Sequence, residues 1–441
     1  MLRKLTLAGL ALCAAYAFSW HYHFFDMKIY LGALSWWADG RDLYTYAAPE
    51  SGLGFTYPPI AAIMLTPLAG WTAEAAGWFL LLGGVAALAL VLPSLLRPLM
   101  VRYGWRRRYV VAAALPLALC TEPVRQTLGM GQVNLLLFAL VVADLMALRR
   151  QTTAPQRGRM TRRGFSLLRR PTLTGWHRFW RGGEWAGIGI GIAAAVKLTP
   201  ALFIVYLVLT RQWRAAGTAV VSGGAATVTG FVIAPDESLR YFGSVLWDTG
   251  RVGNADTTAN QSLGGLLARL HDTVDPPLLP WLLCALTILA VGLTRAHRAH
   301  TAGDELVAFT LVGLTANLVS PISWTHHLLF LLPAVVILAE VAARRATTTG
   351  PDGAQAYPPR RAIQVFGPAI SVYLITVITP IWFYAHELPR TSHYADGLWG
   401  VLFENALALL LIALVTTLPG KGEQAVRSPS VGVGDERPSR L

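Results

Sequence analysis

Long apolar runs separated by short polar breaks occupy most of the 441 residues. A membrane-crossing helix needs roughly 20 apolar residues, or about 17 at the short end. Only 14% of the residues are charged, whereas a soluble domain usually carries about 25%. The pattern therefore predicts an all-α polytopic membrane protein and argues against a soluble enzyme. About 12 crossings are expected, near residues 5–20, 58–95, 109–122, 129–148, 185–196, 200–210, 215–234, 279–294, 305–319, 327–342, 363–383 and 398–417.

Two regions of this pattern allow more than one interpretation. The run 58–95 is long enough for two crossings but is interpreted as one crossing broken at Pro67 and Gly70. With that choice, the number of crossings is even, and both ends of the chain lie on the side that the basic residues indicate. The runs 185–196 and 200–210 are short for a crossing. We interpret them as a broken pair that meets at Lys197–Pro200.

The basic residues predict the orientation of the chain. The net charge is +13, and 29 of the 37 Lys and Arg residues fall in alternate loops and in the two termini. Lys and Arg accumulate in cytoplasmic loops of membrane proteins. Both termini and the basic loop 149–183 are therefore expected in the cytoplasm of a plasma-membrane protein. The loops 21–57 and 235–278 are expected outside.

The chain is expected to form a single integral membrane domain over residues 1–417. The polar segment 418–441 follows it and has the composition of a disordered cytoplasmic tail. The first run resembles a signal peptide, but an uncleaved first helix is favoured, because a polar loop begins a few residues later. For the basic loop, contact with anionic lipid is favoured over binding of nucleic acid.

The first external loop, 21–57, is rich in aromatic residues, and Asp26 directly follows the first crossing. A carboxylate at that depth is costly unless it faces water, a partner or a substrate. Asp26 has two candidate roles, as a helix N-cap or as a catalytic base. Apolar residues after it recur at helical spacing, which predicts a short helix lying in the membrane interface; they are Met27, Tyr30, Leu31, Leu34 and Trp37.

Four further polar clusters lie at the predicted external ends of crossings. A Lys or a His pair inside a hydrophobic protein indicates a functional site, although Lys197 could instead extend to the interface. Together the clusters predict one site on the external face. They are Glu122–Gln126 with Gly129–Asn134, then Lys197–Pro200, then the loop 235–278 with Arg251 and Asn260–Ser262, and last Ser320–His327.

The chemistry that fits such a site is group transfer from a lipid-borne donor. The sequence has no phosphate-binding glycine-rich motif for ATP-driven transport, and it has no internal repeat of the kind typical of secondary transporters. In the expected reaction a carboxylate accepts the proton of an attacking hydroxyl. Lys or Arg side chains stabilise the departing phosphate. A lipid-linked sugar flippase, or a membrane scaffold that acts through the loop 149–183, remains an alternative.

Several of these segments resemble glycosyltransferase family 87. They occur in the family's order, from Asp26-xxx-Tyr30 to Gly40-Arg-Asp-Leu-Tyr44, Phe55-Thr-Tyr-Pro-Pro59, Gly131-Gln-Val-Asn134, Lys197-Leu-Thr-Pro200, Asn260-Gln-Ser262 and Ser323-Trp-Thr-His-His327. The resemblance implies the C-type glycosyltransferase fold, with external loops that carry the site. It also implies an inverting α-1,2-mannosyltransferase that uses polyprenyl-phosphate-mannose. The implied acceptor is a phosphatidylinositol mannoside or a lipomannan-type glycan. An arabinofuranosyltransferase that uses polyprenyl-phosphate-arabinose is the nearest alternative.

The resemblance also implies roles for individual residues. Asp26 would be the general base, and His326 or His327 would assist it or contact the donor phosphate. The expected phosphate contacts are Lys197, Arg125 and Arg251, and the other expected substrate contacts are Tyr57, Gln132, Asn134 and Gln261. No Asp-x-Asp motif is present, so neither a divalent metal nor another cofactor is expected. The expected partners are the lipid-phosphate-sugar donor, the glycolipid acceptor and membrane lipids, with no nucleic acid.

Overall fold

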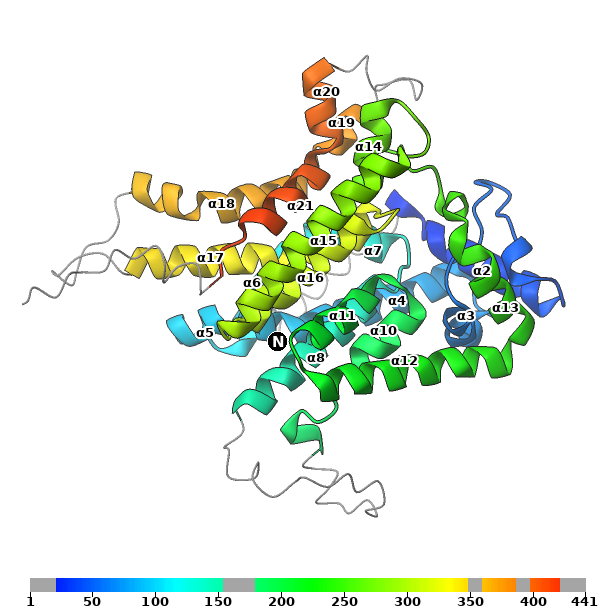
Figure 1. Ribbon diagram of the computed structural model, residues 1–441, viewed down its shortest axis with the longest axis horizontal. Coiled ribbons are helices and arrows are strands. Elements are labelled where there is room, and N and C mark those ends of the chain that lie inside the picture. The colour runs from blue at the N-terminus through cyan, green and yellow to red at the C-terminus, as the bar shows by residue number, and fades with distance from the viewer. Residues whose placement is uncertain (1–20, 154–178, 348–358, 386–396, 421–441) are drawn as a thin grey trace, which may run out of the picture.

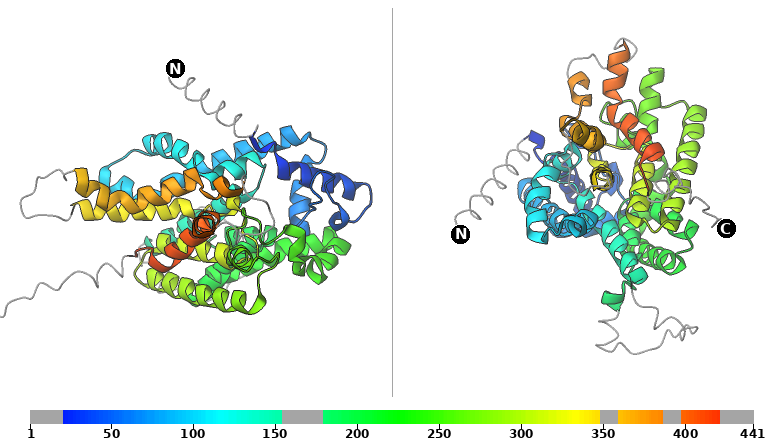
Figure 2. Two further views of the ribbon diagram at one scale, coloured as in Figure 1. Left: turned by 90° about the horizontal axis from the view of Figure 1, so that it is seen from above. Right: turned by 90° about the vertical axis from the view of Figure 1, so that its left-hand side faces the viewer.

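Helices make up most of the described part of the chain. The computed structural model describes residues 21–153, 179–347, 359–385 and 397–420. Within these ranges the regular elements are α-helices and short 3-10 turns, with no β-strand. Many of the longer helices run roughly along the longest axis of the molecule (Figure 1), and Figure 2 shows the same bundle from above and from one end.

The first half of the chain contributes ten of the described helices. They are α2 (Phe25–Ala38), α3 (Pro59–Leu65), α4 (Ala73–Leu95), α5 (Arg97–Tyr103), α6 (Arg107–Leu119), α7 (Glu122–Gly129), α8 (Asn134–Thr153), α10 (Ile188–Val196), α11 (Leu202–Leu209) and α12 (Trp213–Ile233). Helix α8 packs between α4 and α10, and α10 packs against α12.

The second half adds helical pairs to this bundle. Helix α15 packs on α16, and α17 packs on α18. The elements are α13 (Pro235–Gly243), α14 (Leu263–His271), α15 (Leu278–Thr301), α16 (Glu305–Val319), α17 (Leu331–Thr347), α18 (Pro359–Ile378), α19 (Ile381–Ala385), α20 (Gly397–Glu404) and α21 (Ala406–Thr417).

Four helical segments in the described part of the chain are long and apolar enough to cross a membrane. They are Ala73–Leu95, Trp213–Ile233, Leu278–Thr301 and Gln364–Phe383. The pair α20 and α21, bent by 64°, makes a fifth if it counts as one span. On α12 the exposed side chains include Val221 and Val232, which are 70% and 76% exposed. Apolar side chains on the outside of a long helix are what a lipid environment favours, so the prediction of a helical membrane protein is confirmed.

Both regions of ambiguous sequence contain a break between helices. Helix α10 ends at Val196, and Lys197 takes an extended backbone conformation before α11 begins at Leu202. The predicted break at Lys197 is therefore confirmed. In the run 58–95, α3 and α4 are separate helices, and α4 begins where the Thr72 hydroxyl accepts the Ala75 N–H at 3.2 Å.

The helix predicted after Asp26 is present as α2, but its surroundings differ from the prediction. Its apolar residues Met27, Tyr30, Leu31 and Leu34 are all buried and belong to the main hydrophobic core. The apolar face thus packs into the protein instead of lying in the membrane interface. The helical period alone could not distinguish these two environments, because both bury one face of the helix.

Three other predictions concern residues outside the described ranges. The expected first crossing at 5–20 is one of them. Most of the basic loop, at 154–178, and the expected tail from residue 421 onward are the others.

Candidate active site

Backbone hydrogen bonds attach the start of α2 to the turn that follows α7. The Phe24 N–H donates to the Gly129 carbonyl at 2.9 Å, and the Met27 N–H donates to the Met130 carbonyl at 3.1 Å. Gly131 has φ +75°, and a Cβ there would lie 2.9 Å from the Met27 Cβ. Only glycine therefore fits both the conformation and the space at this contact. The turn holds the next residue, Gln132, beside Asp26.

Asp26 lies at one end of a chain of side-chain hydrogen bonds. The Gln132 Nε2 donates to Asp26 Oδ2 at 2.6 Å, and the Tyr57 hydroxyl donates to Gln132 Oε1 at 3.0 Å. The Tyr30 hydroxyl lies 3.2 Å from that of Tyr57. Asp26 is in the first turn of α2, whose N-cap residue is Phe24 and whose first turn has no side-chain cap. The alternative role of Asp26 as an N-cap is therefore wrong.

Lys197 extends from the break between α10 and α11 toward the histidine pair. Its Nζ lies 2.7 Å from His327 Nε2 and 3.1 Å from Asn134 Oδ1. It also lies 5.3 Å from the centroid of the Tyr57 ring. Because Lys197 is surrounded by these side chains in the protein interior, the alternative in which it extends to the membrane interface does not hold.

His326 is held by its backbone carbonyl, and its ring packs edge to face on the ring of His327. Its carbonyl oxygen accepts hydrogen bonds from the Thr127 hydroxyl at 3.1 Å and from Asn134 Nδ2 at 3.3 Å. Both ring nitrogens are buried and have no hydrogen-bond partner among the described residues. Buried polar atoms are normally paired, so an imidazole in this state at a cavity wall is suited to a polar ligand.

These side chains meet at one cavity of about 380 Å³. Seven of the predicted residues line it, namely Asp26, Tyr57, Gln132, Lys197, Arg251, His326 and His327. The cavity also has walls that the site prediction did not name, including Tyr241, Asp248, Trp324 and Trp382. A hydrophobic wall with a few convergent polar groups is the usual composition of a small-molecule site. No group of three or more His, Cys, Asp or Glu side chains comes together as metal ligands within the described ranges.

The other three predicted residues lie behind the walls. Asn134 contacts Lys197 and the backbone of His326. Gln261 donates to the Glu404 carbonyl at 2.7 Å and accepts from the Ala408 N–H at 2.9 Å. It therefore ties its loop to the junction of α20 and α21. None of the three, Arg125 included, is among the described residues that line the cavity.

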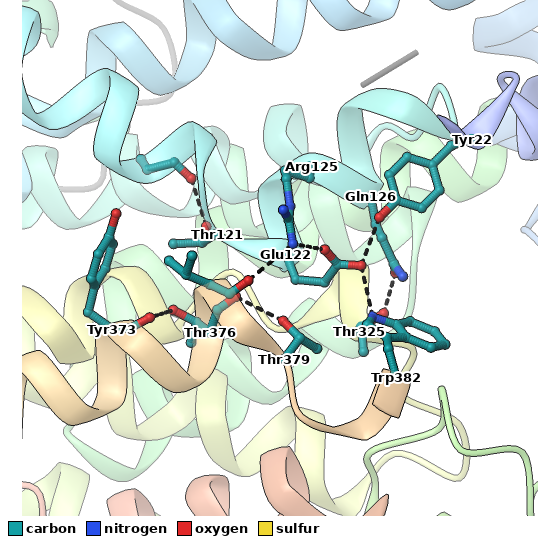
Figure 3. A network of polar contacts seen from close by, with 12 residues as sticks. Tyr22, Thr121, Glu122, Arg125, Gln126, Thr325, Tyr373, Thr376, Thr379 and Trp382 are labelled. Atoms are coloured by element: carbon teal, nitrogen blue, oxygen red, sulfur yellow. Dashed lines mark hydrogen bonds and ion pairs between the residues drawn. The ribbon is translucent and has the colours of Figure 1, made fainter. Parts of the chain in front are cut away.

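Arg125 belongs to a buried polar network shown in Figure 3. Its guanidinium forms an ion pair with Glu122 and donates to the Val377 carbonyl at 3.2 Å. The Glu122 carboxylate also accepts from the Tyr22 hydroxyl at 2.8 Å and from Trp382 Nε1 at 3.0 Å. The network thus joins the segment before α2 to the Trp382 wall of the cavity. Sequence reasoning missed Trp382, although Pro380 two residues earlier marks the end of a helix there.

Arg251 is the second cation at the cavity. It lies in the 3-10 turn Thr249–Val252, and its guanidinium donates to the Tyr44 carbonyl. Its buried Nε has no hydrogen-bond partner within the part of the chain that the structure describes. One edge of the guanidinium is therefore anchored, while the group as a whole keeps donors for a ligand. Guanidinium groups suit phosphate because they offer several N–H donors in one plane.

The cavity changes the acidity of its own groups. Burial raises the pKa of Asp26 to about 6, while the hydrogen bond from Gln132 and the charge of Lys197 oppose the rise. Burial lowers the pKa of Lys197 to about 7, and the charge of Asp26 opposes that change. Burial and the nearby Lys197 charge hold the pKa of both His326 and His327 well below its ordinary value. Near neutral pH the site therefore presents a carboxylate base and neutral imidazoles.

A bell-shaped pH dependence of kcat/KM is expected from these two groups. Activity should rise as Asp26 loses its proton near pH 6 and fall as the Lys197 ammonium loses its charge near pH 7. The profile of kcat/KM reports the groups of the free enzyme, so it is the quantity to measure. In the variant Lys197→Arg the side chain stays positively charged at every accessible pH, because a guanidinium has a much higher pKa than an ammonium group. It should therefore abolish only the alkaline limb. An unchanged alkaline limb would exclude Lys197 as its source.

Comparison with known proteins identifies the family of the chain. The family model described as Glycosyltransferase family 87 matches residues 55–321. The chain belongs to glycosyltransferase family 87. The matched residues include Tyr57, Gln132, Lys197 and Arg251. Asp26 lies before the matched residues and His326 after them.

The chain is similar to individual proteins of known name and to a solved structure. One is the polyprenol-phosphate-mannose-dependent alpha-(1-2)-phosphatidylinositol mannoside mannosyltransferase of Mycobacterium tuberculosis, 32% identical over 73% of this chain and 71% of its own. Another, the corresponding phosphatidylinositol pentamannoside mannosyltransferase of the same organism, is 32% identical over 73% of this chain and 68% of its own. The solved apo structure of ArnT from Cupriavidus metallidurans covers 94% of this chain and 77% of its own at 14% identity, with a TM-score of 0.37.

Proposed function

We propose that the protein transfers mannose from polyprenyl-phosphate-mannose to a hydroxyl group of a phosphatidylinositol mannoside or a lipomannan-type glycan, forming an α-1,2 linkage. The observation that carries this proposal is the meeting of Asp26, Lys197 and His326 at one cavity of about 380 Å³. A base and a cation in one cavity are what sugar transfer from a lipid phosphate requires. The names of two relatives, each 32% identical, support the choice of donor, linkage and acceptor class.

The proposed reaction is a single displacement. The acceptor oxygen forms a bond to C1 of the mannose, and the bond between C1 and the phosphate oxygen breaks. The acceptor proton passes to the Asp26 carboxylate, and the electron pair leaves with the polyprenyl phosphate. A β-linked donor then yields an α-linked product. One base suffices, because phosphate departs as a stable anion and needs no proton from the protein.

The cations would act on the leaving phosphate. Lys197 and Arg251 line the same cavity as Asp26, and each can donate hydrogen bonds to phosphate oxygens as negative charge develops. His326 would add an N–H donor from its unpaired ring. A second, apolar cavity of about 60 Å³ shares Lys197, Thr199 and His327 with the first. We place the first isoprene units of the donor there, next to the phosphate.

The finer topology is part of the same proposal. The fold would be the C-type glycosyltransferase fold with about 12 crossings, with residues 1–417 as one domain and 418–441 as a tail. The loops 21–57 and 235–278, together with the cavity, would face the outside of the plasma membrane. Both termini would be cytoplasmic. The bias of 29 among 37 basic residues supports this orientation.

The decisive experiment offers two donors to the purified, full-length protein. With phosphatidylinositol mannoside as acceptor, polyprenyl-phosphate-mannose should be consumed and polyprenyl-phosphate-arabinose should not. The product should lose its new sugar to an α-1,2-specific exomannosidase. Consumption of the arabinose donor alone would show an arabinofuranosyltransferase instead. Movement of donor across vesicles without any new glycosidic bond would show a flippase.

The same assay includes a control for metal. Transfer should continue in excess EDTA, because Lys197 and Arg251 supply the positive charge that a divalent ion would otherwise provide. Loss of transfer in EDTA and its recovery with Mg²⁺ or Mn²⁺ would contradict the proposed mechanism. Such a result would leave the identity of the donor unaffected, because the sugar that is consumed decides it separately.

A further inference from the structure

A third cavity, which the proposed reaction does not use, lies among arginines far from Asp26. Its volume is about 490 Å³, and it is bounded by the end of α4, by α5, by the start of α6 and by the end of α8. We call it the arginine pocket, after Arg97, Arg107, Arg149 and Arg150, which line it. Figure 1 shows α5 at one end of the molecule and α2, which carries Asp26, toward the other.

The charge of the arginine pocket is strongly one-sided. Four guanidinium groups line it, and no Asp or Glu is among the described residues that do so. Asp304, Glu305 and Glu340 act electrostatically on Arg149, but they lie outside the lining. Arg149 itself donates to the Ser94 carbonyl at 3.4 Å, which orients it across the space between α8 and α4. Such a group of cations favours a multivalent anion, because like charges at close range repel each other.

The rest of the pocket is apolar and reaches the surface of the molecule. Leu90 and Val101 line it and are 64% and 76% exposed. Trp105, also in the lining, is 50% exposed and stacks on Tyr103 at 5.1 Å between ring centroids. Exposed Trp and Tyr side chains are enriched where a membrane protein meets the headgroup region. The pocket thus combines mostly exposed guanidinium groups with an aromatic and aliphatic rim.

From this combination we propose that the arginine pocket binds the phosphate group of an anionic phospholipid in the leaflet opposite the catalytic cavity. The phosphodiester oxygens accept from the guanidinium groups, which pair with phosphate in a bidentate manner. The acyl chains lie along Leu90 and Val101. Basic pockets between transmembrane helices are a known kind of lipid-headgroup site. The apolar rim distinguishes a lipid from free phosphate, which would use only the arginines.

The proposal also revises the interpretation of the basic loop. Arg149 and Arg150 open the segment 149–183, whose arginines suggested general contact with an anionic lipid surface. In the structure these two arginines line one cavity together with Arg97 and Arg107. A general surface attraction depends only on net charge. A pocket depends on which arginines are present, and this difference can be measured.

The test compares two double variants of the full-length protein with equal loss of charge. Arg97→Gln with Arg107→Gln removes two exposed lining arginines, whereas Arg106→Gln with Arg108→Gln removes two exposed neighbours outside the lining. Native mass spectrometry in detergent follows the binding of dioctanoyl phosphatidylinositol, with dioctanoyl phosphatidylcholine as the neutral reference. The wild type should prefer the anionic lipid by about tenfold or more. The lining variant should lose about tenfold in affinity, and the neighbour variant less than about twofold.

Further measurements test whether the variants are folded, whether general surface charge explains the binding, and whether free phosphate competes with the lipid. Unchanged melting temperatures of the lipid-free variants establish that they are folded. Equal weakening in both double variants would mean general surface charge and would overturn the proposal, as would no weakening in either. Inorganic phosphate at millimolar concentration should displace little of the lipid. Complete displacement by phosphate would assign the arginine pocket to a soluble anion instead.

Discussion

Replacement of Asp26 by asparagine is expected to lower kcat for mannose transfer by roughly 10²- to 10⁴-fold, the usual contribution of a positioned general base. Asparagine has the same shape, and its amide can still pair with Gln132. The chemical change is therefore limited to the loss of the proton acceptor. The Asp26 carboxylate accepts from Gln132 at 2.6 Å, faces the cavity and has a pKa of about 6. Initial rates with radiolabelled polyprenyl-phosphate-mannose measure the effect.

The matched control for this variant is Asp39→Asn. Asp39 ends the same helix, is exposed and does not line the cavity. It should change the rate by less than about twofold, as expected for a surface substitution away from the site. Normal transfer by Asp26→Asn would assign Asp26 a structural role and contradict the mechanism. Equal loss in both variants would point to the net charge of α2 instead.

Removal of the Lys197 charge is expected to have an effect of nearly the same size. Lys197→Met keeps most of the side-chain volume but removes the ammonium that lies 2.7 Å from His327 Nε2 and 3.1 Å from Asn134 Oδ1. A preorganised cation in a water-poor site loses little energy to solvent screening. Its removal should therefore cost roughly 10²- to 10³-fold in kcat/KM. The measurement is the dependence of the initial rate on donor concentration.

Lys28→Met is the control for Lys197→Met. Lys28 is exposed on α2, two residues after Asp26, and lies outside the lining of the cavity. It removes the same charge from the same end of the protein and should leave kcat/KM within about twofold of wild type. If Lys197→Met transferred sugar with an unchanged KM for the donor and an unchanged kcat, contact between Lys197 and the donor phosphate would be excluded.

The helical architecture followed closely from the sequence because hydrophobic length and period are local properties. The segment 305–319 was predicted as a crossing and is observed as the helix α16 with the same bounds, but its 15 residues are too few for it to count among the candidate spans. The break at Lys197 was also predictable, since a Lys and a Pro three residues apart interrupt an otherwise apolar run. The surroundings of α2 were not predictable. Burial of its apolar face against the core depends on helices that are distant in sequence.

The candidate site could be predicted as a set of residues but not as an arrangement. Asp26, Lys197 and His327 were chosen because they are polar exceptions near ends of apolar runs, and they line the same cavity. Arg125 was chosen for the same reason, yet its partner Glu122 lies three residues away on the same helix, and the pair supports the Trp382 wall. A local ion pair leaves no mark in a motif that distinguishes it from a phosphate contact.

By itself, the sequence determined that this is a helical membrane protein with rare polar residues grouped in a few segments. It did so because apolar helix length and charge bias act along the chain. Tertiary structure alone decided which polar residues share a cavity. Hydrogen bonds of 2.6 Å between residues 26 and 132, and of 3.3 Å between residues 134 and 326, connect distant segments. It also decided that Arg97, Arg107, Arg149 and Arg150 enclose one pocket. Such contacts depend on how helices pack against one another, which no local pattern specifies.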